Sequence, residues 1–202
     1  MINDYASLQA SIASWLARAD LTSAIPDFIA LGEAAINRDL RVHRMLKTVT
    51  RNVALYAGAP LTFQGGLITY VVDDDGRMPL PADYLEMLGV SELKNGRTIP
   101  LDNRHFMVDA DTIRFNTKSG ASEFSYWARI PPLSEAAPQN WLLSREPGIY
   151  LYSALVEAAP YIQDDARTAI WSAKLSEIVD RLNTQDIGAR FGTARMRVAN
   201  AP

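Results

Sequence analysis

Hydrophobic residues recur at helical spacing in the first forty residues of the chain. Separations of four, three and four positions place one set on a single helical face, and a second set predicts a second helix. The first stripe consists of Leu8, Ile12, Trp15 and Ala19, and the second of Ile25, Phe28, Ile29, Gly32, Ile36 and Leu40. Asp20 or Thr22 is expected to cap the second helix, with Pro26 in its first turn.

Residues 146–186 return to helical spacing and predict two further helices. Pro147 is expected to open the first, and Asp164-Asp165 to start the second, because acidic residues favour helix N-termini. The inward-facing residues of the first are Tyr150, Leu151, Ala154, Leu155, Ala158 and Ile162, and those of the second are Trp171, Leu175, Ile178 and Leu182. Residues from 188 onward show no periodicity.

The middle of the chain, residues 48–130, has the shorter period of β-structure. Strands are predicted at residues 67–72, 97–101, 112–115 and 123–128. Turns are predicted at Asp73-Asp74-Asp75-Gly76 and Asp109-Ala110-Asp111, and Asn95-Gly96 is a strong hairpin signal. Short strands separated by frequent turns indicate a small sandwich or barrel.

The predicted fold is therefore α+β and mainly α. Residues 1–47 and 140–187 form a helical bundle, residues 48–139 an inserted small antiparallel β-domain, and residues 188–202 an extended, flexible C-terminal tail. The tryptophans are expected to serve packing rather than ligand binding, namely Trp15, Trp127, Trp141 and Trp171.

Composition narrows the possible functions. The chain of 202 residues has 48% hydrophobic residues, 21% charged residues and a net charge of −3, which is typical of a globular protein and untypical of a general nucleic-acid binder. It has no cysteine, which excludes disulfides, thiolate catalysis and cysteine-ligated zinc. The N-terminus does not resemble a signal peptide, and no apolar run is long enough to predict a membrane span.

Candidate catalytic chemistry is sparse. The two histidines, His43 and His105, lie in different zones, and motifs of hydrolases, metalloproteases and phosphate-binding loops are missing from the sequence. The Asp73–Gly76 run fits a hairpin turn better than a calcium loop, because the glutamate that ends such a loop is lacking. We therefore predict no enzyme, cofactor or metal site. A carboxylate pair among the 23 acidic residues remains an open alternative.

An ordered series of motifs resembles the head-to-tail adaptor (connector, tail accessory factor) family of tailed bacteriophages. It spans residues 8 to 185 and comprises Trp15-Leu16, Asp20-Leu21, Phe28-Ile29, Ile36–Leu40, Leu80–Glu86, Tyr126-Trp127 with Pro131–Ser134, Asn140–Leu143, Pro147–Leu155, Glu157–Asp165 and Trp171. The resemblance implies a structural protein that forms a dodecameric ring beneath the portal and connects it to the tail nozzle or fibres. Genomic DNA would pass through the channel without sequence-specific binding. The expected location is the head–tail junction of the virion, after assembly in the host cytoplasm; the alternative is a virion-associated cell-wall hydrolase.

Two basic segments are candidate contact sites. The tail has no acidic residue from Ile187 to the end, and its candidate portal-binding residues are Arg190, Phe191, Arg195, Met196 and Arg197. A tail that orders on a partner fits this composition better than a merely disordered terminus. A second set is spaced by three, which predicts one side of a helix: Arg38, Arg41, Arg44 and Lys47. It is open to three interpretations: a solvated face, an inter-subunit contact with Asp73–Asp75 or Asp164-Asp165, or a wall facing DNA.

Overall fold

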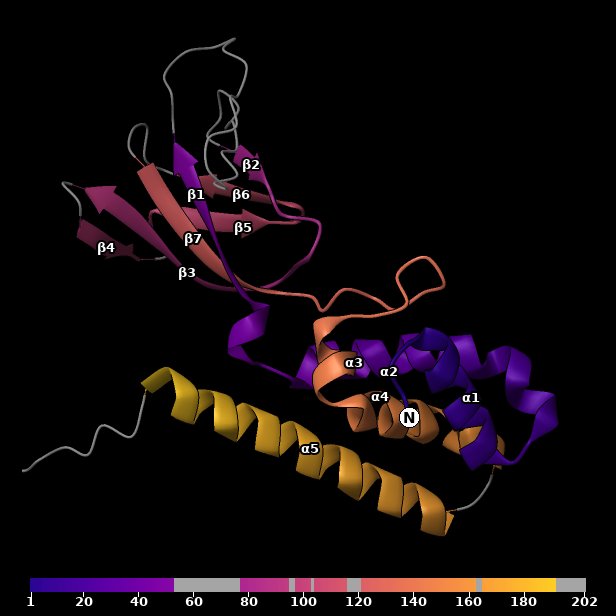
Figure 1. Ribbon diagram of the computed structural model, residues 1–202. Coiled ribbons are helices and arrows are strands. Elements are labelled where there is room, and N and C mark those ends of the chain that lie inside the picture. The colour runs from indigo at the N-terminus through magenta and orange to yellow at the C-terminus, as the bar shows by residue number, and fades with distance from the viewer. Residues whose placement is uncertain (53–76, 95–96, 103, 116–120, 163–164, 192–202) are drawn as a thin grey trace, which may run out of the picture. The chain divides into compact units, whose positions relative to one another are not determined.

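The chain divides into two compact units, one helical and one built of strands (Figure 1). The computed structural model describes residues 1–52, 77–94, 97–102, 104–115, 121–162 and 165–191. The helical unit comprises Met1–His43 and Ile130–Pro202, and the β unit comprises Arg44–Arg129. The polypeptide thus leaves the helical unit after His43 and re-enters it at Ile130.

The helical unit contains five α-helices and one 3₁₀-helix among its described residues. They are α1 (Tyr5–Leu16), the 3₁₀-helix η1 (Ala19–Ala24), α2 (Ile25–Asp39), α3 (Trp141–Arg145), α4 (Pro147–Ile162) and α5 (Asp165–Phe191). Asp4 caps α1 by accepting the backbone N–H of Ser7 at 2.8 Å, while the Ser7 hydroxyl accepts the N–H of Asp4 at 3.0 Å.

The expected cap of α2 is wrong. Asp20 and Thr22 lie inside η1, and α2 begins at Ile25 without a side-chain cap. The carboxylate of Asp20 instead accepts two hydrogen bonds from the guanidinium of Arg18. Pro26 occupies the first turn of α2 as predicted, because the missing N–H of proline has no intrahelical acceptor at that position.

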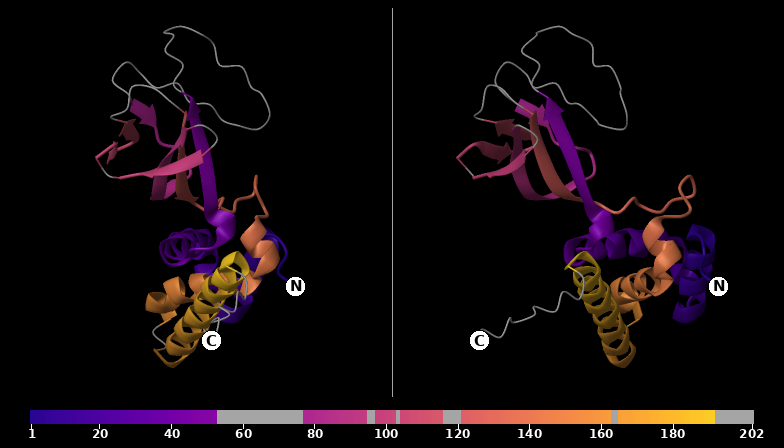
Figure 2. Two further views of the ribbon diagram at one scale, coloured as in Figure 1. Left: turned by 90° about the vertical axis from the view of Figure 1, so that its left-hand side faces the viewer. Right: turned by 60° about the vertical axis from the view of Figure 1, so that its left-hand side comes forward.

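Helix α4 is packed between α2 and α5. Gly32 of α2 lies so close to α4 that a Cβ added there would stand 3.0 Å from the Cβ of Ser153 and 3.2 Å from the backbone nitrogen of Ala154. On the other side of α4, a Cβ on Gly148 would lie 3.5 Å from the Cδ1 of Ile178 in α5. Figures 1 and 2 both show α5 alongside α4. Residues 150, 153 and 154 thus face α2, and residue 148, about 160° round the helix, faces α5.

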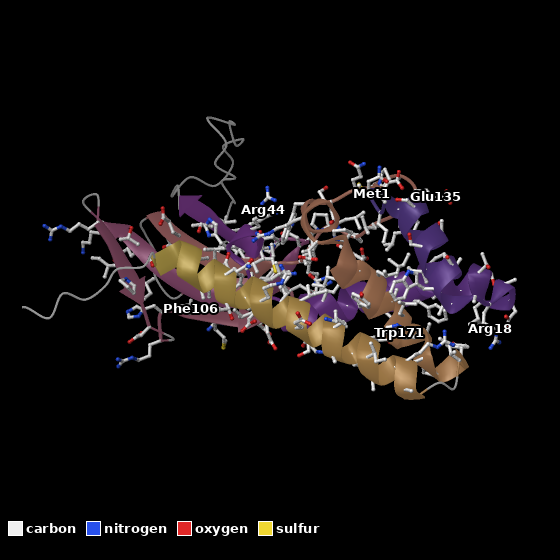
Figure 3. The ribbon with its side chains drawn as sticks, turned by 60° about the horizontal axis from the view of Figure 1, so that its bottom comes forward. Met1, Arg18, Arg44, Phe106, Glu135 and Trp171 are labelled. Carbon is white, nitrogen blue, oxygen red and sulfur yellow. The ribbon has the colours of Figure 1, made fainter. Side chains whose placement is uncertain are left out.

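The buried residues of this unit follow the predicted stripes, except at two positions of the first stripe. Leu8, Ile12 and the whole second stripe are buried, as are most of the inward positions predicted for α4 and α5. Trp171 is 4% exposed and points from α5 toward the interior (Figure 3). The prediction is wrong for Trp15, whose side chain is 46% exposed and lies perpendicular to the ring of Tyr152, with 5.9 Å between the centroids. It is also wrong for Ala19, which is exposed and belongs to η1 instead of α1.

The β unit consists of two antiparallel sheets. Its strands are β1 (Leu46–Asn52), β2 (Arg77–Pro79), β3 (Tyr84–Lys94), β4 (Arg97–Leu101), β5 (Phe106–Asp109), β6 (Thr112–Phe115) and β7 (Ala121–Ala128). Four form a sheet in the order β1-β7-β3-β4, and three form a sheet in the order β2-β6-β5. Both contribute to one core, made of Val49, Met78, Val90, Ile113, Phe124, Tyr126 and Ala128. Two sheets on one core correspond to a sandwich, one of the two alternatives, sandwich or barrel, that the turn-rich spacing predicts.

The hairpin and one of the turns predicted for the β unit are present, and each joins two paired strands. Lys94 pairs with Arg97 across residues 95–96, and Asp109 pairs with Thr112 across Ala110-Asp111. Ala110 has a φ of 47°, a left-handed conformation that a tight turn imposes at some cost on a residue with a Cβ. The predicted strand at residues 67–72 and the turn at 73–76 lie outside the described residues.

The contact between α2 and α4 at Gly32 predicts a clear substitution effect. Gly32→Ala improves helix propensity by about 1 kcal/mol, yet its methyl group would collide with Ser153. We expect a net loss of about 1–3 kcal/mol in the free energy of unfolding, measured by urea denaturation. Gly89→Ala, where a Cβ meets nothing within 4 Å, is the control and should lose little. A Gly32→Ala protein as stable as the wild type would contradict this packing.

Candidate functional site

The segment that leaves the helical unit is held by side chains of α5. Asn183 Oδ1 accepts the backbone N–H of Arg41 at 2.9 Å, and Asp186 Oδ1 accepts that of His43 at 2.7 Å. The two acceptors are three positions apart, on one side of the helix. Residues 40–42 belong to no helix or strand, so these bonds satisfy backbone donors that a ladder would otherwise pair. Helix α5 therefore fixes the point at which the chain departs.

The segment that returns is held in the same manner by α2. Glu33 Oε1 accepts the N–H of Leu133 at 2.8 Å, and Asn37 Oδ1 accepts that of Ile130 at 2.9 Å. Burial raises the pKa of Glu33, although the bond from Leu133 opposes this shift. Ile130 and Leu133 are themselves buried, which is why the helical unit begins again at residue 130 rather than near the expected 140.

Asn140 completes the attachment of the returning segment. Its side-chain nitrogen donates to the carbonyl of Pro131 at 2.7 Å and to the Tyr150 hydroxyl at 2.6 Å. Its side-chain oxygen caps α3 by accepting the N–H groups of Leu142 and Leu143. Burial raises the pKa of Tyr150, opposed by the hydrogen bond from Asn140 and reinforced by the charge of Glu33.

The residues around this attachment leave little space for a ligand. The hollow lined by Glu33, Ile36, Asn37, Ile130 and Tyr150 encloses essentially no volume that a water molecule could occupy. Small-molecule sites usually measure roughly 300–1,000 Å³. The polar groups here serve the backbone of the same chain, and the arrangement is that of a structural joint.

In the β unit, Asp83 connects the Leu80–Glu86 motif with the Tyr126-Trp127 motif. Its carboxylate binds the ammonium of Lys47 and accepts the hydroxyl of Tyr126 at 3.0 Å, and its backbone carbonyl accepts the N–H of Arg129 at 2.7 Å. Burial alone would raise the pKa of Asp83, but the hydrogen bonds from Lys47 and Tyr126 outweigh it and hold the pKa below its ordinary value. The Leu80–Glu86 and Tyr126-Trp127 elements are thus in direct contact.

The four basic residues spaced by three do not share a helical face. Helix α2 ends at Asp39, so only Arg38 belongs to it. The guanidinium of Arg41 donates to the carbonyls of Asn37 and Leu40, Arg44 lies in the 3₁₀-helix η2 (His43–Met45), and Lys47 lies in β1. The predicted helical row is therefore wrong, because the extended segment after Asp39 breaks the period.

The predicted tail begins inside α5. The helix continues to Phe191, so Arg190 and Phe191 form its last turn. Arg195, Met196 and Arg197 lie outside the described residues. The 27 residues of α5 give it a length of about 40 Å, and its C-terminal end is followed directly by the basic segment.

Comparison with known protein families identifies the chain. The family model described as SU10 adaptor protein matches residues 3–199. The chain belongs to the SU10 adaptor protein family. No curated protein matches it. This adaptor is a structural protein of a bacteriophage and a component of its virion. The resemblance drawn from the ordered motifs is thereby confirmed.

Within the described part of the adaptor, no three histidine, aspartate or glutamate side chains gather in a way that could hold a metal ion. His105 Nδ1 lies 2.6 Å from Asp102 Oδ1 in an exposed loop, and Arg104 binds the same carboxylate. His43 contributes its backbone N–H to Asp186. None of the described helices combines the length and apolar character that a membrane span requires.

The residues that hold the two crossing segments were not predicted from the sequence of this adaptor. Glu33 and Asn37 each come one position after a buried residue of the α2 stripe, and Asn183 follows buried Leu182. Such a position at the edge of a stripe is the signal that could have marked them. Their backbone partners lie about a hundred or more positions away, which no local pattern reveals.

Asp83 gives the adaptor a testable acid dependence. Because the folded pKa lies below the ordinary value of 3.8, Asp83 stabilises the fold above about pH 4, and this contribution is lost as the pH falls through the folded pKa. We expect Asp83→Asn to cost about 1 kcal/mol at pH 7, a value reduced for partial exposure. The loss should shrink below pH 4 in urea denaturation series. Asp111→Asn, an exposed acid of the same unit, is the control; equal losses at pH 7 and pH 3 would contradict this role.

Proposed function

We propose that this protein is the head-to-tail adaptor of its phage, a dodecameric ring beneath the portal that connects it to the tail nozzle or fibres. The family match over residues 3–199 is the observation that carries this proposal. The protein acts by binding and not by catalysis. Its place is the head–tail junction, reached after assembly in the host cytoplasm, and genomic DNA passes through its channel without sequence-specific recognition.

The division into two units supports a connecting role. Backbone N–H groups of both segments that link the units donate hydrogen bonds to side chains of the helical unit. The acceptors are Asn183 and Asp186 at one crossing and Glu33 and Asn37 at the other. A subunit that joins two different partners needs two binding regions with firmly attached connections. The helical unit with the C-terminal segment serves the portal in this proposal.

The C-terminal segment is the proposed portal-binding element. Arg190 and Phe191 end α5, and Arg195, Met196 and Arg197 follow, with no acidic residue after Asp186. Arginine and aromatic side chains supply much of the binding energy at protein interfaces. Asn183 and Asp186 bind the backbone of Arg41 and His43, where the chain leaves the helical unit. Since Asp186 lies one turn before Arg190, α5 is held in place up to the start of the portal-binding element.

Of the basic residues proposed for inter-subunit contact, Arg38 is best placed. Its side chain is exposed on α2 and pairs with the adjacent Asp39 at 2.9 Å, and the negative charge of Glu157 also favours its charged form. An exposed pair of this kind is weak and exchanges readily with a neighbour's carboxylate. The other three basic residues lie in different local structures, namely Arg41 after α2, Arg44 in η2 and Lys47 in β1. We propose an inter-subunit contact for each of them independently of the others.

The ring itself can be tested by electron microscopy of the purified protein mixed with the portal protein of the same phage. We expect rings of this protein with twelvefold symmetry, coaxial with the portal. The protein without portal, examined at the same concentration, is the matched sample. If no ring forms in either preparation, the proposal is wrong.

Removal of residues 192–202 tests the portal-binding element while leaving α5 complete. We expect the affinity for the portal to fall at least about tenfold, measured by surface plasmon resonance, because arginine anchors are lost. Arg195→Glu with Arg197→Glu should act in the same direction. Arg145→Glu, a charge reversal at an exposed position of α3, is the control. Full affinity of the truncated protein would show that the portal binds elsewhere.

A further inference from the structure

Among the residues of α2 and α5 whose burial is described, each helix exposes one large apolar side chain on its outer face. Leu31 of α2 is 53% exposed and Ile170 of α5 is 61% exposed. Each is followed three positions later by an exposed alanine, Ala34 in one helix and Ala173 in the other. Apolar side chains at neighbouring positions of a helix surface are typical of a face that another helix covers.

The two outer faces have the same layout. The outer stripe of α2 consists of Asp27, Leu31, Ala34 and Arg38, and that of α5 of Ala166, Ile170, Ala173 and Glu177. In both, the separations are four, three and four, and all eight residues are exposed. The last positions carry opposite charges, Arg38 and Glu177. Aligned in parallel, the stripes bring apolar beside apolar, alanine beside alanine, and arginine beside glutamate.

The directions of the helices allow this parallel alignment between copies. Phe28 meets Tyr161 and Gly32 meets Ser153, so α2 runs antiparallel to α4. Helix α5 also runs antiparallel to α4, which it follows after residues 163–164 (Figure 1). Helices α2 and α5 thus run in the same direction on opposite sides of α4.

The two outer stripes also face away from each other. Leu31 comes one position before buried Gly32, and Ile170 comes one position before buried Trp171. In both helices the exposed side chain is therefore rotated about 100° around the axis from the buried one, in the same sense. Because α2 and α5 bury their inner faces toward α4 from opposite sides, equal rotations turn the outer stripes in opposite directions. Two different surfaces that face opposite ways are what a head-to-tail contact between identical subunits requires.

We propose that the outer stripe of α5 packs in parallel on the outer stripe of α2 in the next copy of this chain. Ile170 then lies beside Leu31, Ala173 beside Ala34, and Glu177 beside Arg38. The inference rests on the proposed ring and names the surfaces that close it. Of the residues in the two stripes, only Arg38 was among the basic residues that the sequence suggested for an inter-subunit contact.

The energetics favour this partner over a two-fold pair of α2 helices. The head-to-tail contact buries both Leu31 and Ile170, whereas an α2–α2 pair leaves Ile170 in water. The alanines permit the short axial separation of closely packed helices. Arg38 and Glu177 form exposed ion pairs with Asp39 and Lys174 respectively, and such pairs are weak, so exchanging these partners for each other costs little.

Cysteine cross-linking tests the contact in a chain that has no native cysteine. The variant Ala34→Cys/Ala173→Cys is oxidised in the free protein and in the complex with the portal, and both samples are viewed by electron microscopy. We expect a ladder of covalent multiples of 22.3 kDa on non-reducing gels. Each single variant should give no ladder. Ala34→Cys/Ser172→Cys, with the second thiol at an exposed position on the other flank of α5, is the matched control.

The outcomes separate this inference from the proposed function. Rings with a ladder support both, and a ladder without rings supports the contact while contradicting the ring. Rings without a ladder, or with an equally strong ladder from the Ser172→Cys control, overturn the contact and leave the ring standing. Dimers from Ala34→Cys alone overturn it in favour of a two-fold pair. Neither rings nor ladder overturns both.

Charge reversal gives a second test that does not depend on thiol geometry. In the cross-linking variant, Arg38→Glu should reduce the cross-linked fraction roughly fivefold, because it sets two carboxylates together. Adding Glu177→Arg should restore it. Circular dichroism checks that each variant is folded. A reduction that Glu177→Arg fails to reverse would count against the pairing of these two residues.

Discussion

The helical unit depends on the close approach of α2 to α4 at Gly32. With no side chain at this position, the backbone of α2 comes within van der Waals distance of Ser153 and Ala154. That approach brings Phe28 onto Tyr161 at one end and Glu33 and Asn37 toward Tyr150 at the other. It therefore positions the two side chains that receive the returning segment. A larger residue at position 32 would separate the helices along their whole length, because packed interiors have little spare volume.

The second constraint is the need to pair the backbone where regular structure stops. Where the chain crosses between the two units, it has no repeating backbone hydrogen bonds, and an N–H group shielded from water there needs an acceptor in the protein. Side chains of α2 and α5 supply them, with Glu33 and Asn37 on one crossing and Asn183 and Asp186 on the other. The same two helices carry the outer stripes proposed to meet between copies. In the proposed ring, the same two helices hold the crossings and contact the neighbouring copies, through different positions around each helix.

Local signals predicted much of the fold because each reports a physical requirement of a short segment. Pro147 opens α4, Asp165 begins α5, and Asn95-Gly96 separates β3 from β4, as their backbone preferences indicate. The predictions that were wrong concern what happens between segments. Trp15 lies at helical spacing from buried Leu8 and Ile12, yet the body covers only one side of α1 and leaves it exposed. The basic residues from Arg38 to Lys47 are spaced by three in the sequence, but α2 ends at Asp39, so this spacing does not place them on one side of a helix.

The sequence by itself determined the class of the fold, its helical and β-rich zones, and membership of the adaptor family, because periodicity, turn residues and ordered motifs are properties of neighbouring positions. It also indicated an acid-free basic segment at the C-terminus. Only the tertiary structure decided how the zones are attached. The acceptors of the crossing segments and the contact of Asp83 with Lys47 and Tyr126 join residues far apart in the chain. Such contacts depend on how the elements pack, and packing is decided by the whole chain at once.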